Sequence, residues 1–372
     1  MCTNPGIAER NSAAKGAGKG RILWLDLAKG LAMAMVLVGH SMRDEMRLSS
    51  PVLDLSYRLV YIIHMTWFFW MSGYTFSLSR NRGTSPLRAA SRRLKKQFPL
   101  WLGYTLLIWA TFRLALFLPR VSDALQEAGY IPLSLDTYLV LAFQANNPWA
   151  YHLWFLLVLM LITLILGLAD AAAGGKHVKA VCWFLFALGV AGLAVRDQLL
   201  LGEWWRLYDY LTLYLPVVCL GVLMTDWQVS RRICLLWGAA GIAYIVIRAV
   251  FFSGFSGNSV RTEVPAARFL IYLLADLLLP GVFLLLKSLL SAGTILRTAP
   301  GRRFLTFLGR ESLLIYLLHQ PLCCAFLGLI LYNRLHLPAL AVMTACLFAS
   351  LAVGFAAVWL RDRFWARSRS AK

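Results

Sequence analysis

"RILWLDLAKGLAMAMVLVGH" (residues 21–40) decides the fold class, because it is an apolar run of membrane-spanning length that carries three ionisable side chains. About 20 apolar residues are enough to cross a bilayer as a helix. Charged groups are costly in the hydrocarbon core, so they are rare there and tend to mark pathways or chemistry. Asp26, Lys29 and His40 therefore call for an explanation that a plain membrane anchor does not supply.

The rest of the chain also has the composition of a membrane protein. Of its 372 residues, 60% are hydrophobic and only 15% are charged, which leaves too few polar residues to cover a water-soluble protein of this size. Segment length then predicts an all-α polytopic transmembrane helical bundle of about ten spans. These spans are residues 22–42, 57–79, 98–118, 150–169, 179–195, 207–224, 232–252, 268–289, 304–330 and 338–360.

The basic residues predict the orientation of these spans. The net charge is +20, and 24 of the 37 Lys and Arg fall in alternate loops and both tails, against eight in the other loops. This asymmetry follows the positive-inside rule, so both termini are expected in the cytoplasm and the charge points to membrane lipids and not to nucleic acid. We expect a disordered cytoplasmic tail over 1–20, an integral membrane domain over 21–364 and a basic cytoplasmic tail over 365–372.

The three ionisable residues of the first span share one helix face. Lys29 and His40 are eleven residues apart, which places them about 20° apart around the axis and about 16 Å apart along it. Asp26 lies about 40° from the same line and can pair with Lys29 at i, i+3. A paired Asp and Lys that merely tolerate burial, with an interfacial His, would give the same pattern. Three such groups on one stripe favour a functional cavity.

The other histidines separate into two groups. His64, His152 and His319 lie inside or at the edge of apolar runs, whereas His177 and His336 lie in polar loops where we expect them to be solvated. No pair has i, i+4 spacing and no HExxH occurs, so no metal site is expected.

Five short motifs follow one another along the chain. In order they are Lys29-x10-His40, "FFWMSGY" (68–74), "RRLKKQFP" (92–99), Trp154–Phe155–Leu156 and "SLLIYLLH" (312–319). Together they resemble acyltransferase family three, the polytopic membrane enzymes that O-acetylate sugars of cell-surface glycans, and within it the fucose 4-O-acetylase-like group. The resemblance covers residues 22 to about 360. Lys29 is a departure, because Arg is commoner at that position of the family.

The resemblance implies an O-acetyltransferase that moves an acetyl group from cytoplasmic acetyl-CoA to a hydroxyl of a cell-surface or lipid-linked carbohydrate. It implies a cell-membrane protein, in the bacterial cytoplasmic membrane, and a glycan-export or acetyl-relay partner. His40 would be the base or acyl carrier, because imidazole titrates near working pH. Lys29 and Asp26 would anchor the inner end of the cavity, and the basic stretch would hold the donor phosphates. We expect donor contacts at Arg92, Arg93, Lys95 and Lys96, and a substrate cavity lined by His64, Ser72, His152, Trp154, Tyr316 and His319.

Two other functions fit the same residues. A secondary transporter or flippase of a lipid-linked sugar could use the charges of the first span as a relay. A non-catalytic membrane scaffold is the third alternative. Acetyl-CoA dependence separates the enzyme from a transporter, and His40→Ala separates it from a scaffold.

Overall fold

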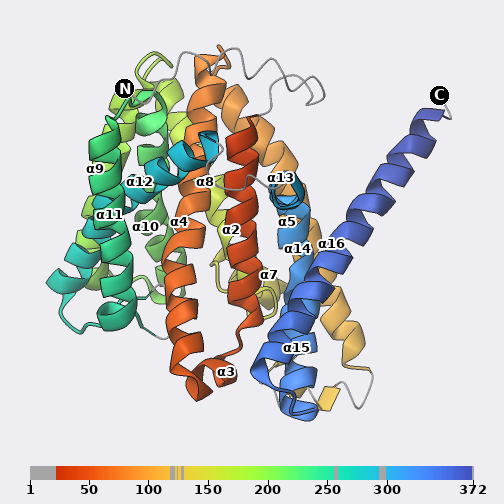
Figure 1. The fold of residues 1–372 in the computed structure, drawn as a ribbon. Coiled ribbons are helices and arrows are strands. Elements are labelled where there is room, and N and C mark those ends of the chain that lie inside the picture. The colour runs from red at the N-terminus through yellow and green to blue at the C-terminus, as the bar shows by residue number, and fades with distance from the viewer. Residues whose placement is uncertain are drawn as a thin grey trace. The chain divides into compact units, whose positions relative to one another are not determined.

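The computed structural model describes residues 22–117, 122–123, 125–126, 130–254, 259–292 and 299–370. Helices dominate these residues, and the only β pairing among them is one isolated bridge between Ser253 and Val260. The predicted all-α polytopic bundle is confirmed (Figure 1). Eight helical segments are long and apolar enough to cross a membrane: Leu23–Ser41, Pro86–Ala115, Tyr151–Ala172, Val178–Gln198, Gly202–Asp226, Arg231–Phe252, Pro265–Ser291 and Ala339–Phe364.

The remaining two predicted spans have different local structures. Residues 57–79 lie inside α4 (Pro51–Asn81), a continuous helix whose Tyr, Trp and His residues lower its mean hydropathy. Residues 304–330 were expected to form one helix, and that expectation is wrong. The chain there is divided into α13 (Ala299–Arg310), α14 (Ser312–Leu318) and π-helical turns from His319. Gln320 is extended (φ −119°, ψ 152°), because the following Pro321 disfavours a helical conformation.

The chain divides into two compact units, residues 1–68 with 226–372, and residues 69–225. We call them unit 1 and unit 2, and α4 runs from the first into the second. The other helices of unit 1 are α2 (Leu23–Ser41), α3 (Asp44–Ser49), α11 (Arg231–Ile247), α12 (Pro265–Ser291), α13, α14, α15 (Leu327–Leu329) and α16 (Ala339–Ser370). Those of unit 2 are α5 (Pro86–Ala115), α7 (Leu135–Phe143), α8 (Trp154–Ala172), α9 (Val178–Val195) and α10 (Trp205–Leu223).

In unit 1, α2 packs against α12, α13 and α16 (Figure 1). Two glycines make the contact with α13 close: a Cβ on Gly30 would collide with the carbonyl of Leu305, and one on Gly309 with the carbonyl of Asp26. Small residues at a helix crossing let two backbones approach in this way. The crossing sets the end of α13 beside the end of α2 that carries Asp26.

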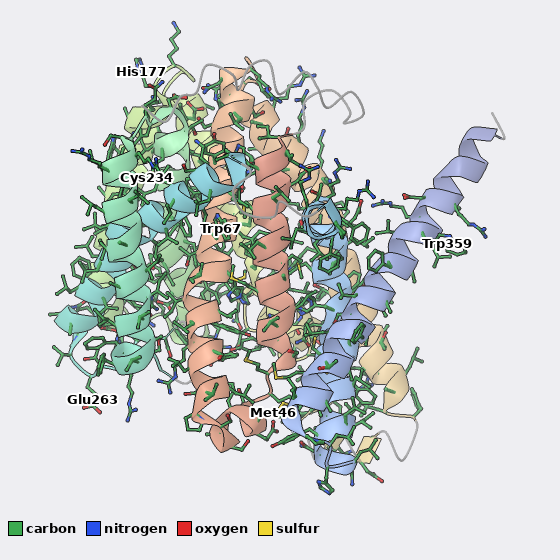
Figure 2. The ribbon with its side chains drawn as sticks, in the orientation of Figure 1. Met46, Trp67, His177, Cys234, Glu263 and Trp359 are labelled. Carbon is green, nitrogen blue, oxygen red and sulfur yellow. The ribbon has the colours of Figure 1, made fainter. Side chains whose placement is uncertain are left out.

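The other end of α2 is held by a separate apolar cluster. Met46, labelled in Figure 2, is fully buried together with Tyr57. Cys324 and Cys346 belong to the same cluster, so α3 and α4 pack there against α16 and the π-helical turns. This packing fixes the segment that follows His319.

Unit 2 is built from two pairs of helices, α5 with α8 and α9 with α10. The C-terminal part of α4 approaches α10 closely, because Gly73 faces the backbone of Val218 and Gly221 faces the backbone of Trp70. Arg80 near the end of α4 pairs with Asp170 near the end of α8, with 2.7 Å between Nε and Oδ2. The Asp170 side chain is 0% exposed, so this ion pair is buried.

Candidate functional site

The predicted base, His40, lies in a cluster of imidazole and phenol rings in unit 1. Its ring centroid is 5.1 Å from that of His319 and 5.9 Å from that of Tyr61. Tyr61 contacts His64 at 4.8 Å, and Tyr316 contacts His319 at 5.9 Å. We call these five residues the imidazole cluster. It brings together four of the residues expected at the site and adds Tyr61.

Hydrogen bonds orient two of the three imidazoles. Nδ1 of His64 lies 2.8 Å from the carbonyl of Val60, and Nδ1 of His319 lies 2.7 Å from the carbonyl of Tyr316. A carbonyl only accepts, so each Nδ1 carries the proton that it donates. In the neutral rings Nε2 is then the basic nitrogen. His64 is 1% exposed and His319 is 0% exposed, so both rings are held inside the protein.

His40 differs from the other two because it is only half-buried. Its Nδ1 lies 3.5 Å from the Tyr61 hydroxyl, at the long end of hydrogen-bond distance. When Nδ1–H donates to that hydroxyl, Nε2 is left free to accept a proton from a substrate. Gly39 makes room for this contact, since a Cβ there would lie 2.9 Å from the Tyr61 ring.

A ladder of aromatic contacts extends from the cluster toward α3. Tyr57 and Tyr61 are one helical turn apart on α4 and stack with their centroids 3.9 Å apart. The guanidinium of Arg47 lies 3.5 Å above the Tyr57 ring. Arg47 is itself paired with Asp44 and Asp54, both at 2.9 Å. The ring beside His40 is therefore fixed by a chain of stacked and ionic contacts.

The two charged residues at the inner end of the predicted stripe lie away from these rings. Asp26 is buried, and its Oδ2 is 3.5 Å from Nε of Arg310 at the end of α13. Lys29 is half-buried on the same helix. The expected pairing of Asp26 with Lys29 stays a prediction, and Arg310 is a partner that the sequence did not predict.

The expected donor residues lie on α5 in unit 2, on different faces. Arg93 donates to the Ser72 hydroxyl at 2.8 Å and to the Thr75 hydroxyl at 2.7 Å, so it is tied to α4. In contrast, Arg92, Lys95 and Lys96 are exposed. Their i, i+3, i+4 spacing puts these three cations on one side of the helix.

The last two expected cavity residues are neighbours in unit 2. His152 is buried in a 3₁₀ turn (Tyr151–Leu153) that precedes α8. Trp154, the first residue of α8, stacks on Tyr210 at 4.1 Å and on Tyr214 at 5.5 Å. The Trp154 ring is thus part of an aromatic stack between α8 and α10.

The two histidines expected in solvent are both exposed. They are His177, labelled in Figure 2 before α9, and His336, which has a left-handed backbone (φ 51°). Within the described ranges, no three His, Cys, Asp or Glu side chains gather in a way that could hold a metal ion. The expectation of no metal stays a prediction.

Sequence reasoning missed Tyr61, although a signal was present. Tyr57, Tyr61 and His64 are spaced i, i+4 and i+7, which puts them on one face of a helix. Arg310 could not be found in this way, because its pairing with Asp26 joins residues far apart in the sequence.

Comparison with known families gives a match over nearly the whole chain. A family described as an acyltransferase domain matches residues 22–359. No curated protein and no solved structure matches the chain. The match covers most of unit 1, all of unit 2 and every residue of the imidazole cluster.

Proposed function

The chain belongs to this acyltransferase family and is a multi-pass membrane acyltransferase, and from that premise we propose that it O-acetylates carbohydrate. The proposed donor is cytoplasmic acetyl-CoA, and the proposed acceptor is a hydroxyl of a cell-surface or lipid-linked glycan. Within the family, the motifs favour the fucose 4-O-acetylase-like group. The proposed location is the bacterial cytoplasmic membrane.

The observation that carries the proposal is the placement of His40. It is the half-buried imidazole of a cluster in which the other two rings are held by backbone carbonyls. A residue that accepts a proton from a substrate must be reachable and oriented, and His40 combines partial exposure with a contact to Tyr61.

The reaction can be written with its protons and bonds balanced. His40 takes the proton of the sugar hydroxyl while the sugar oxygen forms a bond to the thioester carbonyl carbon. The tetrahedral oxyanion collapses, the C–S bond breaks, and the proton on His40 passes to the leaving thiolate. A two-step route through an acetyl-imidazole on His40 uses the same residue and gives the same products.

The donor would be held by the exposed cations of α5. The phosphates of acetyl-CoA are anionic, and Arg92, Lys95 and Lys96 offer three cations on one side of that helix. Arg93 has a different proposed role, because its guanidinium holds α5 to α4 through Ser72 and Thr75.

The test is the replacement of His40. His40→Asn should reduce acetylation at least 10²-fold, the usual contribution of a positioned base, while yield and detergent stability stay the same. Mass spectrometry of surface glycans measures the acetyl groups, and His177→Asn is the matched control on an exposed loop. Full acetylation by the His40→Asn protein would overturn the mechanism and favour a relay role in transport.

A further inference from the structure

A loop of unit 2 buries polar side chains where a connection between helices is usually exposed. It leads from α7, a nine-residue helix too short to span a membrane, to the turn before α8. Gln144, Asn147 and Trp149 are all at least nine-tenths buried, and Ala145 has a left-handed backbone (φ 58°). We call residues 144–149 the amide loop.

Two polar atoms of this loop, Oε1 of Gln144 and Nε1 of Trp149, have no hydrogen-bond partner among the described residues. Nδ2 of Asn147 has none within hydrogen-bond geometry either, although the Tyr138 hydroxyl lies near it. Buried polar groups in proteins are nearly always hydrogen-bonded, because an orphaned donor or acceptor is destabilising. Such atoms gathered within six residues point to a ligand that completes the set.

The donors of the loop are held in fixed directions. Oδ1 of Asn147 accepts from the backbone N–H groups of Trp149 at 3.1 Å and Ala150 at 3.0 Å. This assigns the oxygen of the amide and turns its NH₂ group away from the loop backbone. The Trp149 ring packs on Phe112 at 5.1 Å and on Tyr138 at 5.2 Å, so the indole N–H is fixed as well.

The chemistry of the set fits hydroxyl groups. It offers N–H donors and an amide carbonyl acceptor but no ionised side chain, and a sugar hydroxyl both donates and accepts. Arg206 lies nearby, but it donates to Asn146 and Tyr151 and is not part of the buried set. Tyr151 is 52% exposed, so the polar group formed by Arg206, Asn146 and Tyr151 reaches the surface next to the buried set.

We propose that the amide loop binds an uncharged, hydroxyl-bearing ring of a carbohydrate through Gln144, Asn147 and Trp149. The choice of carbohydrate among hydroxyl-bearing ligands rests on the proposed function. If the atoms instead serve only internal structure, carbohydrate binding will not depend on them.

The test uses the purified full chain in a detergent without a sugar headgroup, and no acetyl-CoA. The probes are the methyl glycosides of glucose, galactose, mannose and fucose, with binding measured by saturation-transfer NMR. Trp149→Phe keeps the aromatic packing but removes the N–H, and Gln144→Met keeps the length but removes the carbonyl. Each variant should weaken binding of the preferred glycoside roughly fivefold, the effect of one lost hydrogen bond. Thermal stability should be unchanged or higher, because a buried orphan group has been removed.

The control is Trp183→Phe, which removes an indole N–H from an exposed position on α9 and should leave binding unchanged. Absence of glycoside binding by the wild-type chain, or equal binding by both loop variants, would overturn the inference. Acetylation that survives His40→Asn would overturn the proposed function instead. Glycoside binding is measured without acetyl-CoA, so failure of the binding inference can be distinguished from failure of the proposed acetylation mechanism.

Discussion

At the scale of single residues, the surroundings of His40 determine what it can do. Proton transfer needs one ring nitrogen oriented toward the substrate, and the hydrogen bond at the other nitrogen sets which one that is. Tyr61 is the group within reach of Nδ1, at 3.5 Å from its hydroxyl. We therefore assign Tyr61 as a positioning residue that acts through His40.

Tyr61→Phe should lower kcat by about tenfold, because it removes the hydroxyl but keeps the ring that stacks on Tyr57. The KM for acetyl-CoA and the thermal stability should change little. Tyr208→Phe is the matched control, since it removes another Tyr hydroxyl, which donates to the carbonyl of Gly192 in unit 2. An unchanged kcat and pH profile in Tyr61→Phe would remove Tyr61 from the mechanism.

The cations of α5 give a second prediction at this scale. Replacing Arg92, Lys95 and Lys96 together by Gln should raise the KM for acetyl-CoA on the order of tenfold or more, with kcat less affected. The effect should shrink at high salt, because exposed charges are screened. Arg93→Gln should instead lower the unfolding temperature, since it breaks hydrogen bonds to Ser72 and Thr75. The reverse pattern, with KM changed by Arg93→Gln alone, would contradict this division of roles.

At the scale of helices, the ninth predicted span shows what hydropathy alone could not resolve. Residues 304–330 are apolar enough to be taken as one span, but α13 and α14 are separate helices. Glu311 between them pairs with Arg361 of α16 at 2.6 Å, and Gly328 lies beside Arg43, just past the opposite end of α2 from Asp26. The chain from Glu311 to Gly328 therefore runs alongside α2, and the predicted ninth span begins near residue 311 and not at residue 304.

The helix α13 has a separate role. Its sequence places Arg302 and Arg303 on an exposed side, while Leu305 and Gly309 contact α2. In Figure 1, α13 is seen end-on while α2 lies in the plane of the picture, so the two helices cross. A short, basic, amphipathic helix of this kind is typical of the membrane interface. Counting apolar residues joined the second half of α13 to the following span, because α13 carries apolar residues on one side and α14 is apolar almost throughout.

The buried ion pair of unit 2 gives the prediction at this scale. Asp170→Leu should destabilise the protein by about 3–5 kcal/mol, because it leaves Arg80 without its carboxylate partner. Arg80→Met combined with Asp170→Leu should be less destabilising than the sum of the two single changes. Thermal unfolding in detergent measures both, and Arg82→Gln, at an exposed position, is the control. Strict additivity would show that the pair carries no coupling energy.

At the scale of the whole molecule, the sequence predicted the class of fold and much of the imidazole cluster. Apolar length, basic loops and the His positions are local properties, so they could be recognised one segment at a time. His40, His64 and His319 were each identified in this way, and the structure brings them together. The pairing of Asp26 with Arg310 and the contact of Arg93 with Ser72 of α4 depend on how helices pack, which no local pattern encodes.

The orientation of the chain in the membrane gives the last prediction. The inner loops and tails hold most of the basic residues, so Lys372 should lie in the cytoplasm and Ser134, before α7, on the opposite side. The same test shows whether the interrupted helical segment after α13, residues 311–334, crosses the membrane. If the chain between residues 311 and 334 crosses the membrane, seven crossings separate the two positions and they face opposite sides. If it turns back, six crossings remain and both positions face the same side.

Reporter fusions at Ser134 and Lys372 measure the two locations, and a fusion at His177 is the cytoplasmic reference. Reporters on the same side at Ser134 and Lys372 would show that residues 311–334 form a re-entrant hairpin.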